Sequence, residues 1–273
     1  MAFIVGVDSP DRLALPSHFR GDLLRFKERH TRIIVGLLGA TLCVIAGTAF
    51  AEGINTLSEA ERATGWRLLF DGESTAGWRG YRSKTVPESW NVENGSLLAR
   101  REEGKSAGDI ITVDQFADFE LTLEWKMTRG NNSGVIYRAT EQHDQVWQSG
   151  PEYQILDNAT HLDGLNILAS AGACYAVFAP AKDATRPIGQ WNQTRIVAAG
   201  KHVEHWMNGE KLVEYEIGSN RWQAHVKTSK FFPTAYGQGN WGLAEKGHIG
   251  LQDYGGAIEF RNIKIRLLAA DDD

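Results

Sequence analysis

Residues 118–127 read DFELTLEWKM, and their strict alternation decides the fold class. Apolar side chains fall on every second position, from Phe119 to Met127, and polar or charged side chains fill the positions between them. Successive side chains of a β-strand point to opposite faces, so this pattern predicts a strand with one buried face. A helix would need a period near 3.6, which this stretch lacks.

The same alternation continues toward the C-terminus. Residues 194–199 and 202–208 predict a hairpin across Gly200. Asn208-Gly209 is a strong signal for a two-residue turn, and it predicts a further antiparallel strand at 211–217.

The end of the chain predicts a second hairpin, formed by 248–254 and 258–267 across two glycines. Within its second strand the apolar residues change parity near Arg261-Asn262. Because a slip of one residue turns every side chain to the other face, this change predicts a β-bulge. Helical patterning is confined to a short helix at 58–62, with Ser58 as its N-cap.

Composition is that of an ordinary globular protein, with 273 residues, 42% of them hydrophobic and 23% charged. The formal net charge of -5 excludes a basic footprint, so no nucleic-acid partner is expected. About a dozen strands without a fixed repeat predict an all-β, two-sheet jelly-roll sandwich of the concanavalin A-like type. In such a fold, ligands bind on the concave face.

The first 51 residues read as a targeting region. A basic stretch precedes an apolar run at 33–50, which ends in Ala49-Phe50-Ala51. This pattern predicts a secretory signal peptide cleaved after Ala51, and hence a periplasmic or secreted protein with no stable membrane anchor. A retained anchor is the alternative. Residues 1–30 form an unusually long N-terminal region for a signal peptide, which suggests a misassigned start codon.

The rest of the chain divides simply. Residues 52–64 form a lead-in, 65–268 a single β-sandwich domain and 269–273 an acidic tail. Cys174 is then the one cysteine of the mature chain, and its apolar neighbours predict a small core residue.

Three predicted strands carry polar residues that break the apolar alternation. Glu152 and Gln154 share one face of their strand, and His248 and Gln252 share one face of another. Arg138 has the parity of Ile136 at the end of a third. Glycines lie beside all three groups, so a shared site on the concave face and a solvated outer surface are both open interpretations.

A series of motifs occurs in a fixed order along the chain: LLFDG (68–72), WNVENG (90–95), DFEL (118–121), NSGV (132–135), GPEYQILD (150–157), VEHWMNG (203–209), GHIGLQD (247–253) and FRNIKI (260–265). Together they resemble a known family, the 3-keto-disaccharide hydrolase domain (3-keto-glucoside 1,2-lyase and 3-keto-2-hydroxy-glucal hydratase). The similarity extends from about Gly65 to Leu267. Tyr254 departs from it, since many members have a histidine after the Gln-Asp pair.

The resemblance implies an exported enzyme acting on a sugar whose C3 hydroxyl has been oxidised to a ketone. The ketone acidifies the C2 hydrogen, a base removes it, and the C1 substituent leaves by β-elimination; water can then add to the glucal. Such a route needs a base and an enolate stabiliser. The expected base is Glu152 or His248, with Arg138 as the stabiliser.

The resemblance also implies residues that hold the sugar. We expect the side chains of Gln154, Asp157, Gln252 and Asp253 to bind hydroxyl groups and Tyr175 to stack on the ring. No metal-ligating residues are predicted, and a bound divalent cation is the alternative to Arg138.

Two other classes of function compete with the enzyme. A non-catalytic carbohydrate-binding module of lectin type shares this sandwich and its aromatic residues. A domain that binds a protein partner is the third hypothesis. The difference lies in a poised ionisable group on the concave face, which a binding module does not need; Glu152 and His248 favour the enzyme.

Overall fold

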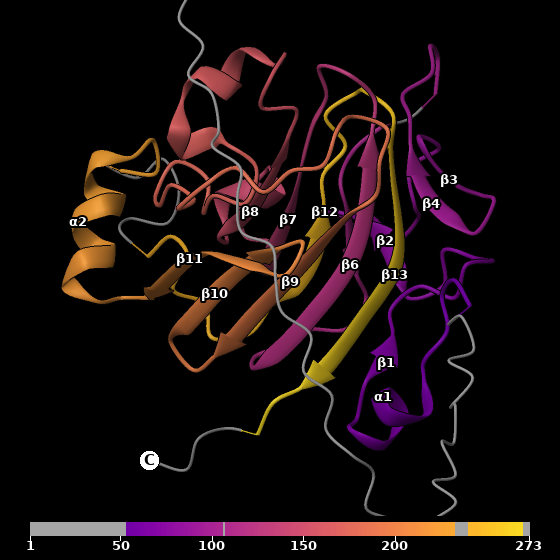
Figure 1. The fold of residues 1–273 in the computed structure, drawn as a ribbon, viewed down its shortest axis with the longest axis horizontal. Helices are drawn as coiled ribbons and strands as arrows, with labels where there is room; N and C mark the ends of the chain where they lie inside the picture. Colours follow the sequence, from indigo (N-terminus) through magenta and orange to yellow (C-terminus); the bar gives the residue numbers. More distant parts are fainter. Residues whose placement is uncertain (1–52, 106, 233–239, 270–273) are drawn as a thin grey trace, which may run out of the picture. The chain divides into compact units, whose positions relative to one another are not determined.

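The computed structural model describes residues 53–105, 107–232 and 240–269, which belong to one compact unit. Two antiparallel sheets pack face to face (Figure 1), and the expected two-sheet sandwich is confirmed. The first sheet runs in the order β11 (Glu210–Glu216), β10 (His202–Met207), β9 (Asn192–Ala199), β6 (Phe119–Met127), β13 (Ile258–Leu267), β4 (Ser96–Ala99) and β3 (Trp90–Glu93), with β1 (Arg67–Leu68) also paired to β13.

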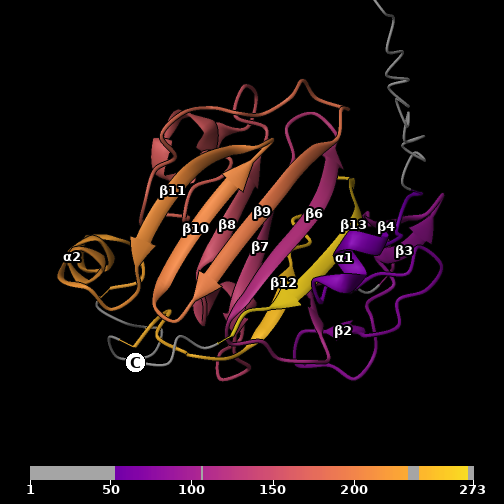
Figure 2. The same ribbon diagram turned by 60° about the horizontal axis from the view of Figure 1, so that its bottom comes forward.

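The second sheet is smaller and carries the site described below. In Figure 2 the large sheet lies in front, and β7 and β8 of the second sheet lie behind it. The strands follow the order β2 (Trp78–Gly80), β5 (Ile110–Thr112), β12 (His248–Leu251), β7 (Asn132–Ala139) and β8 (Glu152–Leu156).

The core fills the space between the two sheets. Leu121, Leu123 and Trp125 of β6 are buried from one side, and Val135 and Tyr153 from the other. Because these residues alternate along their strands, the remaining positions of the second sheet point to its outer face.

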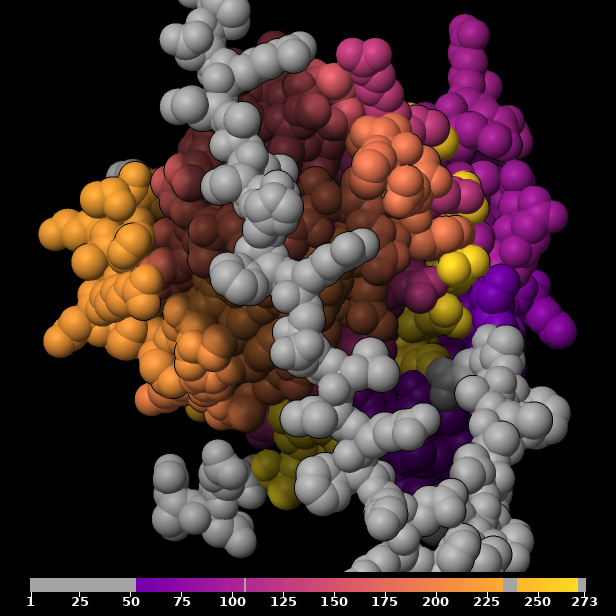
Figure 3. All heavy atoms as spheres, viewed as in Figure 1, coloured from indigo at the N-terminus to yellow at the C-terminus, as the bar shows by residue number. Residues whose placement is uncertain are grey.

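Two helices flank the sandwich in the described residues. The helix α1 (Glu59–Ala63) has the predicted N-cap, since Ser58 accepts a hydrogen bond from the Glu61 amide. The helix α2 (Asn220–Thr228) packs through Trp222, which stacks on Tyr215 at the edge strand β11. Figure 3 shows α2, in orange, at the edge of the molecule. The Trp222 ring of this helix lies 6.1 Å from the Phe178 ring, measured between centroids.

The predicted second hairpin is wrong, although both of its strands exist. β12 belongs to the second sheet and β13 to the first, so the glycines between them lead the chain across the sandwich. Period-two patterning identifies a strand but not its partner. The bulge is confirmed: the pairing of β13 with β6 shifts between Arg261 and Lys264, and Asn262 has a φ of 50°.

Several expectations lie outside the described residues. These are the signal peptide with its cleavage after Ala51, the alternative anchor, and residues 270–273 of the acidic tail. Within the ranges given above, no helix combines the length and the apolar character needed to cross a membrane.

Candidate active site

A pocket of about 190 Å³ opens on the outer face of the second sheet. β8 supplies Glu152 and Gln154, which point to the same face as the parity of the sequence predicted. Gln252 comes from the end of β12 and Asn132 from the start of β7. We call it the Glu152 pocket, and it is lined by Asn132, Trp147, Glu152, Gln154, Asp163, Tyr175, Lys230, Gln252 and Tyr254.

Gly134 creates the space for the Glu152 carboxyl group. It lies on β7 opposite Gln154 of β8. The next residue on the same face of β7, Ile136, lies opposite Glu152. A methyl group added there would lie 2.8 Å from Cγ and Cδ of Glu152. The glycine therefore lets the side chain lie flat across the neighbouring strand.

A segment that pairs with the free edge of β8 positions Tyr175. The amide of Tyr175 donates to the Glu152 carbonyl oxygen, and the amide of Gln154 donates to Ala173. These bonds continue the ladder beyond β8 and bring the Tyr175 ring to the pocket. The short helix η1 (Val146–Gln148) supplies Trp147 on another side; Val146 is fully buried and anchors this turn.

Lys230 places a cation inside this aromatic wall. Its Nζ lies 4.3 Å from the ring centroid of Trp147 and 4.3 Å from that of Tyr175. Burial lowers its pKa, while the negative charges of Glu152 and Asp163 act in the opposite direction. An ammonium held between two ring faces is a preformed partner for an oxyanion.

Glu152 is a buried acid in this pocket, and its surroundings change its acidity. It is 4% exposed, and its carboxyl group makes no hydrogen bond to another described residue. Burial raises its pKa to about 8; Lys230 lowers it and the carboxylate of Asp109 raises it further. A carboxyl group of this kind can take up or release a proton near neutral pH.

The pocket also holds amide groups that lack protein partners. Both polar atoms of the Gln154 side chain are buried and unpaired within the described part of the chain, as is Oδ1 of Asn132. A buried amide without a partner costs free energy, so its presence in a pocket indicates a ligand that supplies the hydrogen bonds. Hydroxyl groups can both donate to and accept from such amides.

Arg138 does not line the Glu152 pocket, so the expectation that it lies beside Glu152 is wrong. The pairing of β7 with β12 shifts between the two ends of β12, and Arg138 has a φ of 52°. Its guanidinium group instead donates to the Ala117 and Gly200 carbonyl oxygens and lies 3.2 Å from an oxygen of Asp118. The bulge breaks the parity that the prediction assumed.

His248 also lies outside the pocket. It begins β12, whereas Gln252 follows the end of that strand, a separation of about 13 Å along extended chain. Its Nδ1 lies 2.7 Å from the Thr112 carbonyl oxygen, and its Nε2 lies 3.0 Å from Gln115. The residue thus shares a face with Gln252 without sharing its site.

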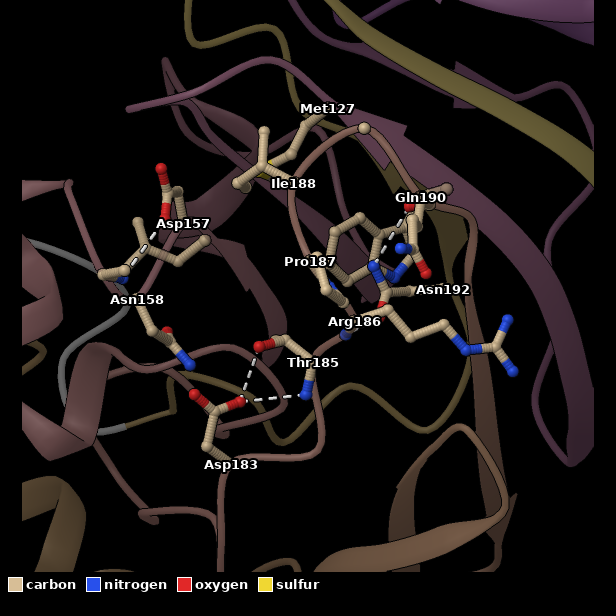
Figure 4. A pocket seen from close by; sticks show the side chains of 14 residues that line it. Met127, Asp157, Asn158, Asp183, Thr185, Arg186, Pro187, Ile188, Gln190 and Asn192 are labelled. Carbon is tan, nitrogen blue, oxygen red and sulfur yellow. Dashed lines mark hydrogen bonds between the residues drawn. The ribbon is translucent and has the colours of Figure 1, made fainter.

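Asp157 and Asp253 accept hydrogen bonds from backbone amides of nearby turns, and neither lines the Glu152 pocket. Burial opposes ionisation of Asp157, but hydrogen bonds from Thr160 and from backbone amides outweigh it and lower its pKa. Asp157 borders a separate pocket of about 280 Å³, beside Ile188 and Asp183 (Figure 4). Asp253 accepts hydrogen bonds from Arg101 and from the Gly108 and Gly255 amides.

Sequence reasoning missed Asn132, Trp147, Asp163 and Lys230. Asn132 has the parity of Gly134 on its strand, which could have indicated the site. The other three come from turns, where no periodic pattern shows which way a side chain points. Tyr254, noted above as a departure, does line the pocket and packs against the His161 ring at 6.2 Å.

A metal-binding geometry occurs away from the pocket. Among the described residues, His202, Glu204 and Glu214 bring three ligand atoms within 4.8 Å of one another on β10 and β11. The ammonium of Lys211 lies 3.2 Å from Glu204 and 2.5 Å from Glu214. Lys211 thus already pairs with both carboxylates, and the cluster lies on the other sheet.

Comparisons with known proteins agree with this architecture. A 3-keto-disaccharide hydrolase of Bacteroides thetaiotaomicron is 32% identical over 247 residues, covering 80% of this chain and 83% of the relative. A predicted glycosyl hydrolase of Parabacteroides distasonis has a similar crystal structure, with a TM-score of 0.72, 30% identity, and coverage of 80% of this chain and 100% of that one. A second crystal structure of a predicted glycosyl hydrolase from the same species has a TM-score of 0.58 and a sequence identity of 29%. The match covers 74% of this chain and 99% of that one.

The family model for the 3-keto-alpha-glucoside-1,2-lyase-like domain matches residues 65–266. This range contains every strand of both sheets up to the penultimate residue of β13 and all the residues of the Glu152 pocket. The resemblance drawn from the motifs is thereby confirmed, and the chain belongs to the 3-keto-alpha-glucoside-1,2-lyase-like domain family.

Proposed function

We propose that the protein cleaves 3-keto-glycosides, with Glu152 as the base that removes the C2 proton. The supporting observation is the buried Glu152 carboxyl group, close to the Lys230 ammonium, in a pocket whose Gln154 amide, like that carboxyl group, makes no side-chain hydrogen bond to another described residue. The family and the 3-keto-disaccharide hydrolase relative support the substrate class.

In the proposed reaction the C3 ketone acidifies the C2–H bond. Ionised Glu152 takes this proton, and the positive charge of Lys230 stabilises the enolate oxygen. The enolate then re-forms the C3 carbonyl, its C2–C3 electron pair becomes the C1–C2 double bond, and the C1–O bond breaks as the leaving oxygen takes up the proton that Glu152 gained, which leaves Glu152 ionised again. Gln154, Asn132 and Gln252 hold the sugar hydroxyl groups, while the rings of Tyr175 and Trp147 pack against the sugar. Addition of water to the glucal would complete a net hydrolysis.

The test follows the C2 hydrogen. The purified protein is incubated in deuterated water with a 3-keto-disaccharide and with its unoxidised parent. We expect cleavage of the keto sugar alone, with deuterium entering at C2 or a slower reaction of substrate deuterated at C2. Glu152→Gln should lower turnover by about 10²–10⁴-fold, the usual contribution of a positioned base.

Two results would contradict the proposal in different ways. Cleavage without exchange and without a C2 isotope effect would remove the elimination step. Binding without any turnover, with Glu152→Gln changing affinity only, would favour the carbohydrate-binding module. Lys230→Met separates the charge of this residue from its packing, and we expect a lower kcat with a smaller change in KM.

We also propose export with cleavage after Ala51, on the basis of the apolar run and the Ala-Phe-Ala sequence. Mass spectrometry of the protein from its native host would identify the N-terminus. An intact residue 1 in a membrane fraction would favour the anchor.

A further inference from the structure

A second, larger cavity lies next to the Glu152 pocket on the same outer face. It measures about 490 Å³ and is bordered by β2, β5 and the turn before η1. The lining residues used below are Tyr81, Thr85, Arg101, Asp109 and Gln145. Tyr81 packs against Ile111 and Ile136, which form the apolar cluster on this outer face, so the cavity does not open into the core.

Strand register joins the two hollows. Leu251 of β12 pairs with Ile110 of β5, so in an antiparallel ladder Gln252 and Asp109 are the next neighbours. The Asp253 amide donates to Oδ1 of Asp109 at 2.9 Å, which confirms the close approach. Gln252 lines the Glu152 pocket and Asp109 lines the cavity.

A second connection comes from the turn at η1. Gln145 lines the cavity, and Trp147, two residues further, lines the Glu152 pocket. The two hollows therefore share one boundary on the sheet and another above it. We call the two hollows together the groove; their lining residues come from β8, from β7, from the end of β12, from the residues just before β5 and from β2.

Size determines how a glycoside would occupy this groove. The Glu152 pocket, at about 190 Å³, is below the roughly 300–1,000 Å³ of typical ligand sites, so it suits one sugar ring. The group attached to C1 must then lie outside it. The cavity offers carboxylate, amide, guanidinium and hydroxyl groups, a set that matches hydroxyl groups better than an apolar surface.

We propose that this cavity is the leaving-group subsite and that it binds a hydroxyl-rich group, a second sugar, through Asp109 and Gln145. The assignment rests on the proposed function, because it places the ketone-bearing ring in the Glu152 pocket. The competing location is an apolar rim beside Asp163, where Leu162, Leu165 and Ile167 are 85%, 94% and 62% exposed. That rim would select an apolar leaving group instead.

The experiment compares two 3-keto-glucosides that differ only at C1, one with a second glucose and one with a methyl group. We expect the wild-type protein to have the higher kcat/KM for the disaccharide. Gln145→Ala should lower the ratio of the two kcat/KM values about five- to tenfold, as expected for one lost hydrogen bond. Gln142→Ala is the matched control: the residue is exposed three positions earlier and lines neither hollow.

Asp109→Asn gives a second, independent readout. The amide retains an oxygen for the Asp253 amide but removes a negative charge that acts on Glu152. We expect a lower disaccharide preference together with a pH–rate profile whose rising limb moves to lower pH. Movement of that limb without a change in disaccharide preference would show only the charge effect of Asp109 on Glu152 and would count against the subsite.

Three outcomes decide the question. A ratio that Gln145→Ala and Asp109→Asn leave at the wild-type value overturns the subsite. A ratio lowered by Leu165→Ser but not by Gln145→Ala overturns it in favour of the apolar rim. Absence of cleavage of both substrates by the wild-type protein refutes the proposed function, and the subsite falls with it.

Discussion

At the scale of single residues, the site depends on one missing side chain. Glu152 lies over Gly134 because no Cβ stands there, and in this position its carboxyl group makes no hydrogen bond to another of the described residues. The same arrangement leaves the group free to meet a substrate. Activity should therefore be sensitive to Gly134 even though this residue has no chemistry of its own.

We predict that Gly134→Ala lowers kcat/KM strongly while the protein stays folded. The added methyl group would contact Cγ and Cδ of Glu152, so the carboxyl group must turn away from its present place. Misplacement of a base by about 1 Å can cost about 10²-fold. Steady-state kinetics and circular dichroism measure the two effects. Gly250→Ala on the same face is the control, since its methyl group would meet Val146 and not Glu152.

Burial of Glu152 also predicts how stability depends on pH. Its pKa rises from an ordinary value of 4.5 to about 8 in the folded state, so between these values the folded protein binds more protons than the unfolded chain. The contribution of this residue to stability must fall as pH rises through that window. Glu152→Gln removes the titration. We expect the variant to gain stability relative to wild type between pH 5 and pH 8, measured by urea unfolding.

The control for this experiment is Glu103→Gln, which changes an exposed glutamate. Its stability difference from wild type should be the same at both pH values. An equal difference for Glu152→Gln would mean that the Glu152 carboxyl group is not desolvated as the structure indicates.

At the scale of elements, bulges decide what the sequence can reveal. Period two placed Glu152 and Gln154 correctly because β8 is regular over its whole length. The same reasoning misplaced Arg138 because this residue lies in the irregular part of β7, where one extra residue reverses the face to which the side chain points. The bulge in β13 was readable only because apolar residues flank it on both sides. A pattern can thus show a bulge only where both neighbouring stretches are half buried.

The β13 bulge should contribute measurably to stability. Asn262 has a φ of 50°, and its side chain and amide exchange hydrogen bonds with Asn55, which ties the lead-in segment to the sheet. We predict that Asn262→Ala lowers the free energy of unfolding by about 2 kcal/mol, since the Asn55 amide would lose its acceptor. Asn94→Ala, at φ 51° on an exposed turn, isolates the backbone strain. Equal losses in the two variants would assign no energy to the Asn55 pair.

At the scale of the whole molecule, the sequence predicted the layers but not the walls of the site. Alternation along strands specifies a sandwich and the polar floor formed by Glu152, Gln154 and Gln252. Trp147 and Lys230 belong to segments that are far apart in the sequence, and only the folded topology brings them together. The same holds for β12 and β13, which are neighbours in sequence but lie in different sheets.

Cys174 offers a test of whether those walls belong to the cooperative unit. Its backbone forms an isolated β-bridge with Tyr153 of β8; its thiol is fully buried, and burial raises the pKa of the thiol to about 12. A thiolate is the reactive form, so the native protein should not react with a thiol reagent such as DTNB. Tyr175 is the next residue, and local opening of this segment would expose the thiol and dismantle the pocket together.

We predict that, for the protein prepared from residue 52 onward, DTNB labelling and loss of tryptophan fluorescence occur over the same range of urea concentration. Coincident transitions are expected because the segment at 172–178 is hydrogen-bonded to β8 and also packs on Trp222 of α2 through Phe178. Labelling at clearly lower urea would instead show that this wall opens independently, as lids and binding loops often do. In that case the Glu152 pocket would be completed only on binding, and a product or substrate analogue should suppress the early labelling.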